Sequence, residues 1–299
     1  MAQYLLMGSS GPDPGAVVAV VGATGRQGSA VVRHLLRDRW RVRALTRDPS
    51  GAAARALGDQ GAQIYRVDTE DIGSLATAFH GVHGAFNVQN PMSSSLAAEV
   101  RQGRHVAEAA AEAGVSHIVY GAAGIGEEAT GVGSWHSKRA VAARFRDLGL
   151  RLTVLRPMAF MELMTDKTYY PSVGVWHLMP KLMGSGRPVG WLCLDDLGAI
   201  TARVFADPDR WGDTSLELVS DVQSVDACRA LWAEVAGRRA RGFPMPVWMF
   251  ERFVGTDLTT MWRWLRTADF EMSPKATREI LPEALTVRDW MRRTLPESR

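Results

Sequence analysis

The most informative stretch of the chain reads Gly22-Ala23-Thr24-Gly25-Arg26-Gln27-Gly28. It directly follows five apolar residues, Val17–Val21, which are typical of a buried strand, and it opens a segment with apolar residues at helical spacing. A glycine at a strand end permits a tight turn, a second lets the backbone approach a pyrophosphate, and a third lets the helix pack on the strand. In this context the pattern predicts a dinucleotide-binding turn, although its spacing, G-x-x-G-x-x-G, differs from the commoner G-x-G-x-x-G.

The first half of the chain alternates short apolar runs with longer amphipathic segments. We expect strands at 17–21, 41–46, 63–67, 84–88, 116–120 and 151–155, and helices at 28–38, 50–60, 71–79, 96–113 and 134–148. Strands and helices that alternate in this way form a parallel sheet with helices on both faces. The sequence therefore predicts an α/β fold with a Rossmann-type doubly wound parallel sheet.

The composition changes after Pro157. Eight of the ten tryptophans and ten of the thirteen methionines lie beyond it, and the helices expected there, at 227–235, 247–253 and 258–267, stand alone. We expect residues 1–15 to form a flexible leader, 16–156 the dinucleotide-binding domain, and 157–299 a smaller, mostly helical substrate lobe with some segments returning to the sheet. The tryptophans and methionines could form the core of this lobe or line a cleft for a large, flat, apolar ligand.

The second expected strand ends in Thr46-Arg47-Asp48-Pro49, about 20 residues after the glycines. At this position an acid binds the 2′-hydroxyl of NAD, or an arginine binds the 2′-phosphate of NADP. Arg47 and Arg26 together suit a phosphate dianion and favour NADP, whereas the competing interpretation takes Asp48 as the ribose acid. Asp68, at the end of the third expected strand, is a candidate for contacts on the adenine side and for the N-cap of the next helix.

Charge, hydropathy and cysteine count exclude several classes of protein. The 299 residues carry 35 basic and 32 acidic side chains without a long run of one sign, so we expect no nucleic-acid partner. No stretch reaches the ~18 apolar residues of a membrane span, and the start does not resemble a signal peptide. Two cysteines, Cys193 and Cys228, are too few for a disulfide framework, and His80 and His83 lie near no cysteine or carboxylate cluster. We therefore expect a cytoplasmic protein with no membrane partner and no metal.

Further stretches occur in an order that is characteristic of one family. Besides the glycine turn they are Val42–Pro49, Gln60–Ala62, Val67-Asp68, Gly81–Val88 and Leu155–Glu162. With these residues the chain resembles the NmrA-like family of atypical short-chain dehydrogenases/reductases. The resemblance implies a Rossmann domain that binds NADP(H) and a small C-terminal substrate lobe. Some members reduce quinones, aromatics or unsaturated carbonyl compounds, and others are redox sensors that report to a protein partner, so membership does not choose between these functions.

The resemblance also implies roles for single residues. Gly22, Thr24, Gly25, Gln27 and Gly28 match the phosphate turn, Arg47 matches the 2′-phosphate arginine, Gln89 and Asn90 match the segment beside the nicotinamide ribose, and Lys138 matches the lysine that contacts this ribose. Lys138 is one of four lysines, in a segment otherwise furnished with arginine, which makes a plain surface role less attractive.

The chain departs from the family pattern at the proton relay. Ser134 stands four residues before Lys138, where short-chain dehydrogenases carry tyrosine and many NmrA-like chains carry histidine. His136 precedes the lysine by only two residues, about 200° around a helix, so it reaches the site only if the helix begins at Ser137. We keep His136 as a candidate catalytic residue beside a solvated or capping role. The serine that usually follows the fifth strand is replaced by Gly121-Ala122.

Residues 160–182 combine aromatic residues with prolines and glycines, which predicts an irregular lid over the nicotinamide. Tyr169 and Tyr170 in this segment are candidate proton donors, beside water and the substrate. Leu163 follows Glu162 where relatives often carry asparagine, and it makes the site more apolar.

Together these features predict an NADP(H)-dependent oxidoreductase of the NmrA-like type that acts on a bulky apolar carbonyl, quinone or enone. One alternative is a catalytically silent NADP(H) sensor that binds a protein partner. Another is a redox-neutral isomerase or cyclase that retains NADP. The expected partner is a small apolar or aromatic substrate, and a homodimer or a protein partner stays open.

Overall fold

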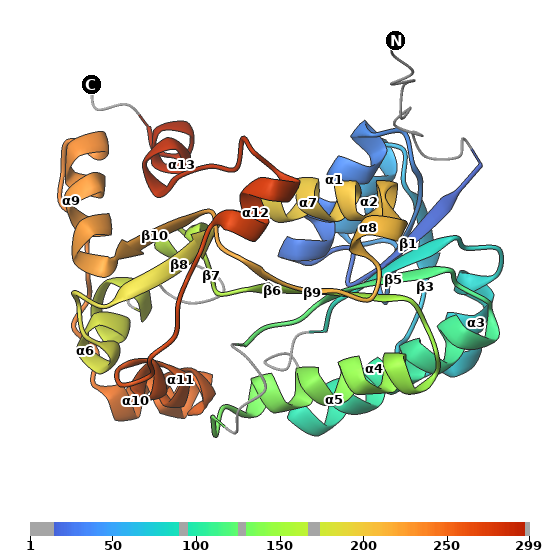
Figure 1. The fold of residues 1–299 in the computed structure, drawn as a ribbon, viewed down its shortest axis with the longest axis horizontal. Coiled ribbons are helices and arrows are strands. Elements are labelled where there is room, and N and C mark those ends of the chain that lie inside the picture. The colour runs from blue at the N-terminus through green and yellow to red at the C-terminus, as the bar shows by residue number, and fades with distance from the viewer. Residues whose placement is uncertain (1–14, 90–94, 125–129, 167–173, 297–299) are drawn as a thin grey trace, which may run out of the picture.

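The computed structural model describes residues 15–89, 95–124, 130–166 and 174–296. Its centre is a seven-stranded parallel sheet in the order β3-β2-β1-β4-β5-β6-β9 (Figure 1). The strands are β1 (Val17–Val21), β2 (Arg41–Thr46), β3 (Gln63–Arg66), β4 (Gly84–Asn87), β5 (His117–Gly121), β6 (Leu152–Pro157) and β9 (Ser215–Leu218). The order reverses between β1 and β4, and open α/β sheets bind ligands beyond the carboxyl ends of strands at such a reversal. The predicted Rossmann-type fold is confirmed, and its seventh strand comes from beyond Pro157.

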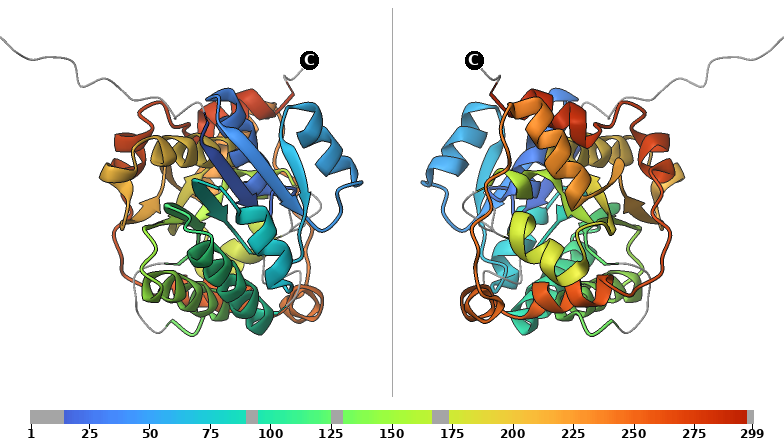
Figure 2. Two further views of the ribbon diagram at one scale, coloured as in Figure 1. Left: turned by 90° about the vertical axis from the view of Figure 1, so that its right-hand side faces the viewer. Right: turned by 90° about the vertical axis from the view of Figure 1, so that its left-hand side faces the viewer.

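Helices cover both faces of the sheet (Figures 1 and 2). One face carries α1 (Arg26–Arg37), α2 (Ala52–Asp59), α7 (Leu194–Ala206), α8 (Pro208–Trp211) and α12 (Lys275–Ile280), and the other carries α3 (Ile72–Phe79), α4 (Leu96–Glu112) and α5 (Gly133–Asp147). Glycines allow close packing on both faces. A Cβ on Gly198 of α7 would lie 2.6 Å from the Ala30 oxygen of α1, and a Cβ on Gly103 of α4 would lie 2.4 Å from a methyl of Val141 in α5.

The strand β1 shows why its sequence is apolar without alternation. Val17, Ala19 and Val21 belong to the core beneath α3, α4 and α5, whereas Val18 and Val20 belong to the core beneath α1 and α7. All five side chains are buried, because a parallel strand with helices on both faces has no side in water.

A second, three-stranded sheet lies in the part of the chain after Pro157. Its order is β10-β8-β7, with β7 (Ala159–Phe160), β8 (Pro188–Leu192) and β10 (Asp221–Ser224). The helices of this part are the 3₁₀ turn η2 (Met161–Met164), the π turn η3 (Gly174–Leu178), α6 (Met179–Met183), α9 (Val225–Ala236), α10 (Val247–Val254), α11 (Asp257–Leu265) and α13 (Val287–Thr294). The three expected helices are confirmed as α9, α10 and α11, but the C-terminal part also contains this sheet, because β7 pairs with β8 directly after β6 ends.

The expectation that residues 160–182 form no regular element is wrong wherever they are described. They form η2, η3 and most of α6, because Met161, Met164 and Trp176 are buried in one apolar cluster. The Trp176 Nε1 donates to the Met164 oxygen at 3.1 Å, which joins η2 to η3. Tyr169 and Tyr170 lie outside the described residues.

Within the described ranges, no helix is long and apolar enough to cross a membrane. The same ranges contain no group of three or more histidine, cysteine, aspartate or glutamate side chains that could hold a metal ion. Cys193 and Cys228 are both buried, and burial raises the pKa of the Cys228 thiol to about 12. The two thiols are therefore protonated, buried groups at neutral pH.

Candidate cofactor and substrate site

The glycine turn joins β1 to α1 in a conformation that excludes larger residues. Gly22 has φ +73°, and a Cβ on it would lie 2.9 Å from the Val88 oxygen. A Cβ on Gly28 would lie 2.1 Å from the Gly22 oxygen, to which Gly25 N donates at 2.9 Å. The N-cap residue of α1 is Gly25, which has no side chain to cap the first N–H groups, and such a helix N-terminus suits an anion. The turn is thus a cradle that fits a pyrophosphate.

Two polar side chains of the turn complete this cradle. Thr24 is exposed at its centre. The Oε1 of Gln27 is buried and has no hydrogen-bond partner among the described residues, and it lies beside the end of β5, 3.1 Å from where a Cβ on Gly121 would stand. A buried acceptor without a donor is unfavourable. A hydroxyl of a bound nucleotide would satisfy it, so this atom also fits a dinucleotide.

Arg26, the first residue of α1, reaches the C-terminal part of the chain. Its guanidinium forms an ion pair with Asp166, two residues after η2. The structure therefore does not support the prediction that Arg26 shares a phosphate with Arg47, because Arg26 already has a counter-charge. The pair instead ties the cofactor turn to the segment that follows η2.

The residues after β2 favour Arg47 over Asp48 as the group at the ribose. Asp48 accepts hydrogen bonds from Ser50 N at 3.0 Å and from Ser50 Oγ at 2.7 Å, and the side-chain bond is the largest cause of a lowered Asp48 pKa. Asp48 thus stabilises the turn that leads into α2. Arg47 is exposed, and its guanidinium meets no counter-charge in the described part of the chain.

Asp68 is exposed after β3, on the adenine side of the predicted site. Its Oδ1 accepts from Glu70 N at 3.0 Å. The expected N-cap role is wrong: Asp71 caps α3 by accepting from Gly73 N at 3.0 Å, because it directly precedes the helix. Asp68 stays a prediction for the cofactor.

Lys138 is buried in α5 and contacts the backbone of the segment after β4. Its Nζ donates to Glu99 Oε1 at 2.8 Å and to the Gln89 oxygen at 3.2 Å. Glu99, in the first turn of α4, is fully buried and also accepts a hydrogen bond from Ser137 Oγ. The sequence reasoning missed Glu99, although it shares a helix face with the buried Gly103, Val106 and Ala110.

In the segment that ends β4 and follows it, the backbone oxygen of Gln89 accepts from Lys138, and the side chains of Asn87 and Gln89 bond to each other. The Gln89 Nε2 donates to Asn87 Oδ1 at 2.6 Å, and the Asn87 Nδ2 donates to Gln89 Oε1 at 3.3 Å. Both residues are buried. Asn90 lies outside the described residues.

Tyr120, at the end of β5, is a core residue. Its hydroxyl is buried with no partner among the described residues, and burial raises its pKa well above the usual value, with a further contribution from the Glu99 charge. The ring packs on Phe145, with 5.9 Å between centroids. Tyr120 therefore does not replace the missing relay.

In the first turn of α5, His136 and Ser134 both form hydrogen bonds with residues other than Lys138. The helix begins at Gly133, not at Ser137, and His136 is exposed, with its Nδ1 accepting from an Arg139 N–H at 2.8 Å. The structure therefore does not bring His136 to the lysine. Ser134 donates its hydroxyl and its backbone N–H to the carboxylate of Asp257 in α11. This link between α5 and the C-terminal part could not be predicted from local sequence.

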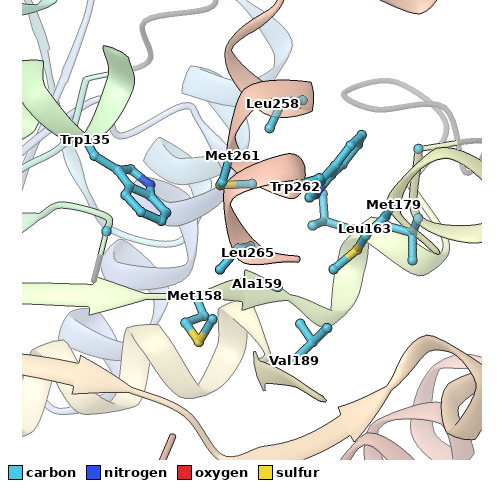
Figure 3. A pocket seen from close by; sticks show the side chains of 13 residues that line it. Trp135, Met158, Ala159, Leu163, Met179, Val189, Leu258, Met261, Trp262 and Leu265 are labelled. Carbon is cyan, nitrogen blue, oxygen red and sulfur yellow. The ribbon is translucent and has the colours of Figure 1, made fainter. Parts of the chain in front are cut away.

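An apolar pocket that opens to solvent lies between α5, β6–β7 and α11. Its thirteen lining residues are all apolar or glycine. In Figure 3, Trp135 lines the pocket from α5, Met261 and Trp262 line it from α11, Met158 lies below them, and Leu163 lies beside Met179 at the right. Part of the tryptophan and methionine enrichment therefore lines this pocket, and Leu163 lines it as well.

Glu162, beside this pocket, links η2 to the start of α7. Its Oε1 accepts from Leu194 N at 3.0 Å, at the start of α7, and burial raises its pKa. Asp196 in the same helix accepts from Leu285 N at 2.8 Å, and burial raises its pKa as well. Through these two carboxylates, the N-terminal end of α7 is joined to η2 and to Leu285.

Comparison with known proteins agrees with this geometry. The model of the NmrA-like family matches residues 14–290. The NmrA-like family domain-containing oxidoreductase himF of Aspergillus japonicus is 32% identical over 246 residues, which are 75% of this chain and 74% of that protein. NmrA, a negative transcriptional regulator, solved in complex with NADP, has a TM-score of 0.76 at 19% identity, over 95% of this chain and 96% of that one. The triphenylmethane reductase of Citrobacter sp., complexed with NADP(H), has a TM-score of 0.75 at 19% identity, over 94% and 100%. The two structures share the fold, and because the family model spans nearly the whole chain, this protein belongs to the NmrA-like family.

Proposed function

We propose that the protein is an NADP(H)-dependent oxidoreductase that reduces a bulky apolar carbonyl, quinone or enone. The observation that carries the proposal is the apolar cavity, which shares α5 with Lys138: Trp135 lines the cavity one turn before the lysine. Aromatic and thioether walls suit a large, flat, apolar acceptor. The relative himF is named an oxidoreductase, and the triphenylmethane reductase was solved with NADP(H), which supports the same class of reaction.

In this proposal, different residues would bind different parts of the cofactor and the substrate. When bound, the nicotinamide would supply the hydride. The glycine turn and the N-terminus of α1 would hold the pyrophosphate, Arg47 would bind the 2′-phosphate, and Lys138 would orient the nicotinamide-side ribose. The apolar walls of the cavity would exclude water and hold the acceptor.

A catalytically silent sensor is the second candidate, and one contact favours it. Ser134 stands at the position of the relay tyrosine, and its hydroxyl is committed to Asp257. NmrA, which shares the fold, is described as a negative transcriptional regulator. A sensor of this kind would bind NADP(H) and a protein partner without transferring hydride.

Turnover and binding measured together distinguish the two candidates. NADPH oxidation is followed with a panel of flat quinones and enones, beside calorimetric titrations with NADPH and NADH. An oxidoreductase consumes NADPH with at least one acceptor. Tight NADPH binding without consumption of the cofactor by any acceptor favours the sensor, and no binding of either dinucleotide contradicts both candidates.

Substitution of Arg47 tests the choice of cofactor. We expect the unmodified protein to prefer NADP over NAD by about 2–3 kcal/mol, the scale of charge-assisted hydrogen bonds to a phosphate. Arg47→Ala should remove most of this preference and leave NAD binding nearly unchanged. Arg41→Ala is the matched control, because Arg41 is an exposed arginine at the other end of β2. Equal affinities for NAD and NADP in the unmodified protein would contradict the NADP assignment.

A further inference from the structure

A buried ion pair lies at the edge of the proposed nicotinamide site. The Lys138 Nζ and Glu99 Oε1 are 2.8 Å apart, and the two side chains are 9% and 0% exposed. Ser137 Oγ donates to the other oxygen of Glu99, and the Gln89 oxygen accepts a second hydrogen bond from Lys138. Both charged groups are therefore held by more than their mutual contact.

The packing of α4 on α5 brings the two charges together. Gly103 of α4 leaves room for Val141 of α5, since a Cβ on Gly103 would lie 2.4 Å from a Val141 methyl. Glu99 lies one turn before Gly103, and Lys138 lies one turn before Val141, so the close approach continues to the ion pair. Glu99 is also in the first turn of α4, where the helix dipole favours a carboxylate.

An ion pair is a poor way to stabilise a buried position. Removing two charges from water offsets most of their attraction, and apolar side chains of similar volume often stabilise such a position as well or better. The effect that apolar side chains cannot reproduce is electrostatic. Lys138 places a cation near the ribose while Glu99 cancels its charge, so the pair contributes no net charge to its surroundings.

We propose that Glu99 is a positioning residue that neutralises Lys138 and thereby lets the site accept the oxidised and the reduced cofactor alike. This inference rests on the proposed function, which places Lys138 at the nicotinamide ribose. The oxidised nicotinamide ring carries a positive charge and the reduced ring carries none. A single uncompensated charge within about 10 Å, at an effective dielectric constant of about 20, changes affinity for a charged group roughly tenfold.

A double-mutant cycle on the pair gives effects of opposite sign. Glu99→Gln leaves the cation uncompensated, so we expect the ratio of the NADP⁺ Kd to the NADPH Kd to rise about tenfold. Lys138→Met leaves the carboxylate uncompensated, so the same ratio should fall about tenfold. The double variant restores neutrality, and its ratio should return to within about twofold of the unmodified protein. A tenfold change of the ratio corresponds to about 30 mV in the midpoint potential of the bound cofactor.

The controls separate charge from structure. Glu108→Gln breaks the second α4–α5 ion pair, between Glu108 and Arg144 at 2.8 Å, and should leave the ratio unchanged. Circular dichroism and thermal melting report folding, and if Glu99→Gln does not fold, the Lys138→Met ratio alone decides the sign. A loss of affinity that is equal for both cofactor forms in the single variants overturns the inference and leaves the proposed function standing. Failure of the unmodified protein to bind either form overturns the proposed function itself.

Discussion

The cores on the two faces of the large sheet and the core of the C-terminal part are filled with different side chains. Among the described buried residues, the first two consist mainly of valine, alanine and leucine, with Trp40 as their single tryptophan and no methionine. The third, which joins the C-terminal part to the first turn of α5, contains six tryptophans and five methionines. The large sheet is thus packed with small branched side chains, whereas the C-terminal part is packed with tryptophan and methionine.

The difference in core side chains matches the proposed ligand of each region, which is the cofactor for the large sheet and the substrate for the C-terminal part. Small branched side chains and glycines keep strands and helices at short, fixed distances. This rigidity suits a phosphate turn that has no room for a Cβ at Gly22 and Gly28. Tryptophan and methionine are large, and methionine adapts its shape, so their packing can leave space such as the apolar pocket between α5 and α11. We infer that the sheet half defines the cofactor and that the C-terminal part defines the substrate.

Gly28→Ala should have the largest effect, because it adds a methyl group where the packing is tightest. Its Cβ would lie 2.1 Å from the Gly22 oxygen, a backbone atom that cannot move without opening the turn. We expect NADPH affinity, measured by fluorescence titration, to fall at least about 100-fold, in line with overpacking costs of about 1–3 kcal/mol and the loss of phosphate contacts.

Gly58→Ala is the control for this change. A Cβ on Gly58 meets only ordinary contacts with Ile64 and lies inside α2, so binding should stay within about twofold and stability should rise slightly. NADPH affinity of the Gly28→Ala protein within tenfold of the unmodified protein would contradict a rigid turn.

His117 should make the sheet half sensitive to acid. Thr153 Oγ1 donates to the Trp211 oxygen at 2.7 Å, so His117 Nε2 must donate to Thr153 Oγ1 at 2.8 Å, and the buried Nδ1 has no partner among the described residues. Burial, followed by the charges of Arg151 and His83, lowers the His117 pKa to about 4. The native state therefore holds the ring neutral, while the unfolded chain protonates it near its ordinary pKa of 6.5.

Stability should accordingly be present above pH 6.5 and be lost as the pH falls toward 4, by about 3 kcal/mol from this group. Urea unfolding between pH 7 and pH 4 measures the loss, and His117→Gln should flatten the curve over this range. His136→Gln, at an exposed histidine, is the control and should leave it unchanged. Parallel curves for the unmodified and His117→Gln proteins would show that the neutral ring contributes nothing.

Met261→Trp should fill the cavity while sparing the cofactor turn. Met261 lies in α11 and lines the cavity, so a larger ring there excludes a flat ligand. We expect the fluorescent probe 1-aminoanthracene to bind about tenfold more weakly, the effect of about 1.4 kcal/mol of lost contact. NADPH affinity should change less than about twofold. Met249→Trp in α10, outside the cavity lining, is the control, and equal probe binding by both variants would place the apolar site elsewhere.

Ser134→Ala should have the smallest effect. It removes the hydroxyl that bonds to Asp257 across the two regions, which costs about 1 kcal/mol in unfolding free energy. Ser134→Thr keeps a hydroxyl and should cost less. Turnover with any accepted substrate should change less than about twofold in both variants. A large loss of turnover in Ser134→Ala alone would identify the serine as the proton donor.

The strands of the first half and the glycine turn could be predicted because their signals are local. Five consecutive apolar residues before Gly22 suffice to indicate a strand buried on both faces. The three-stranded sheet had no such signal, because β7 contains only Ala159 and Phe160 and becomes a strand through its pairing with β8. The capping role of Asp68 was wrong for a related reason, since Asp68 lies three positions before Asp71 and the residue directly beside the helix caps it.

The sequence by itself determined the α/β class, the phosphate turn and Arg47 as the candidate for the ribose, because each depends on neighbouring residues and on steric limits that hold in any fold. The tertiary structure alone decided which side chains meet at the site. Glu99 and Lys138 are 39 residues apart, Ser134 and Asp257 are 123 apart, and Arg26 and Asp166 are 140 apart. Such pairs form only after helices pack against each other and the C-terminal part settles on the sheet, so no local pattern contains them.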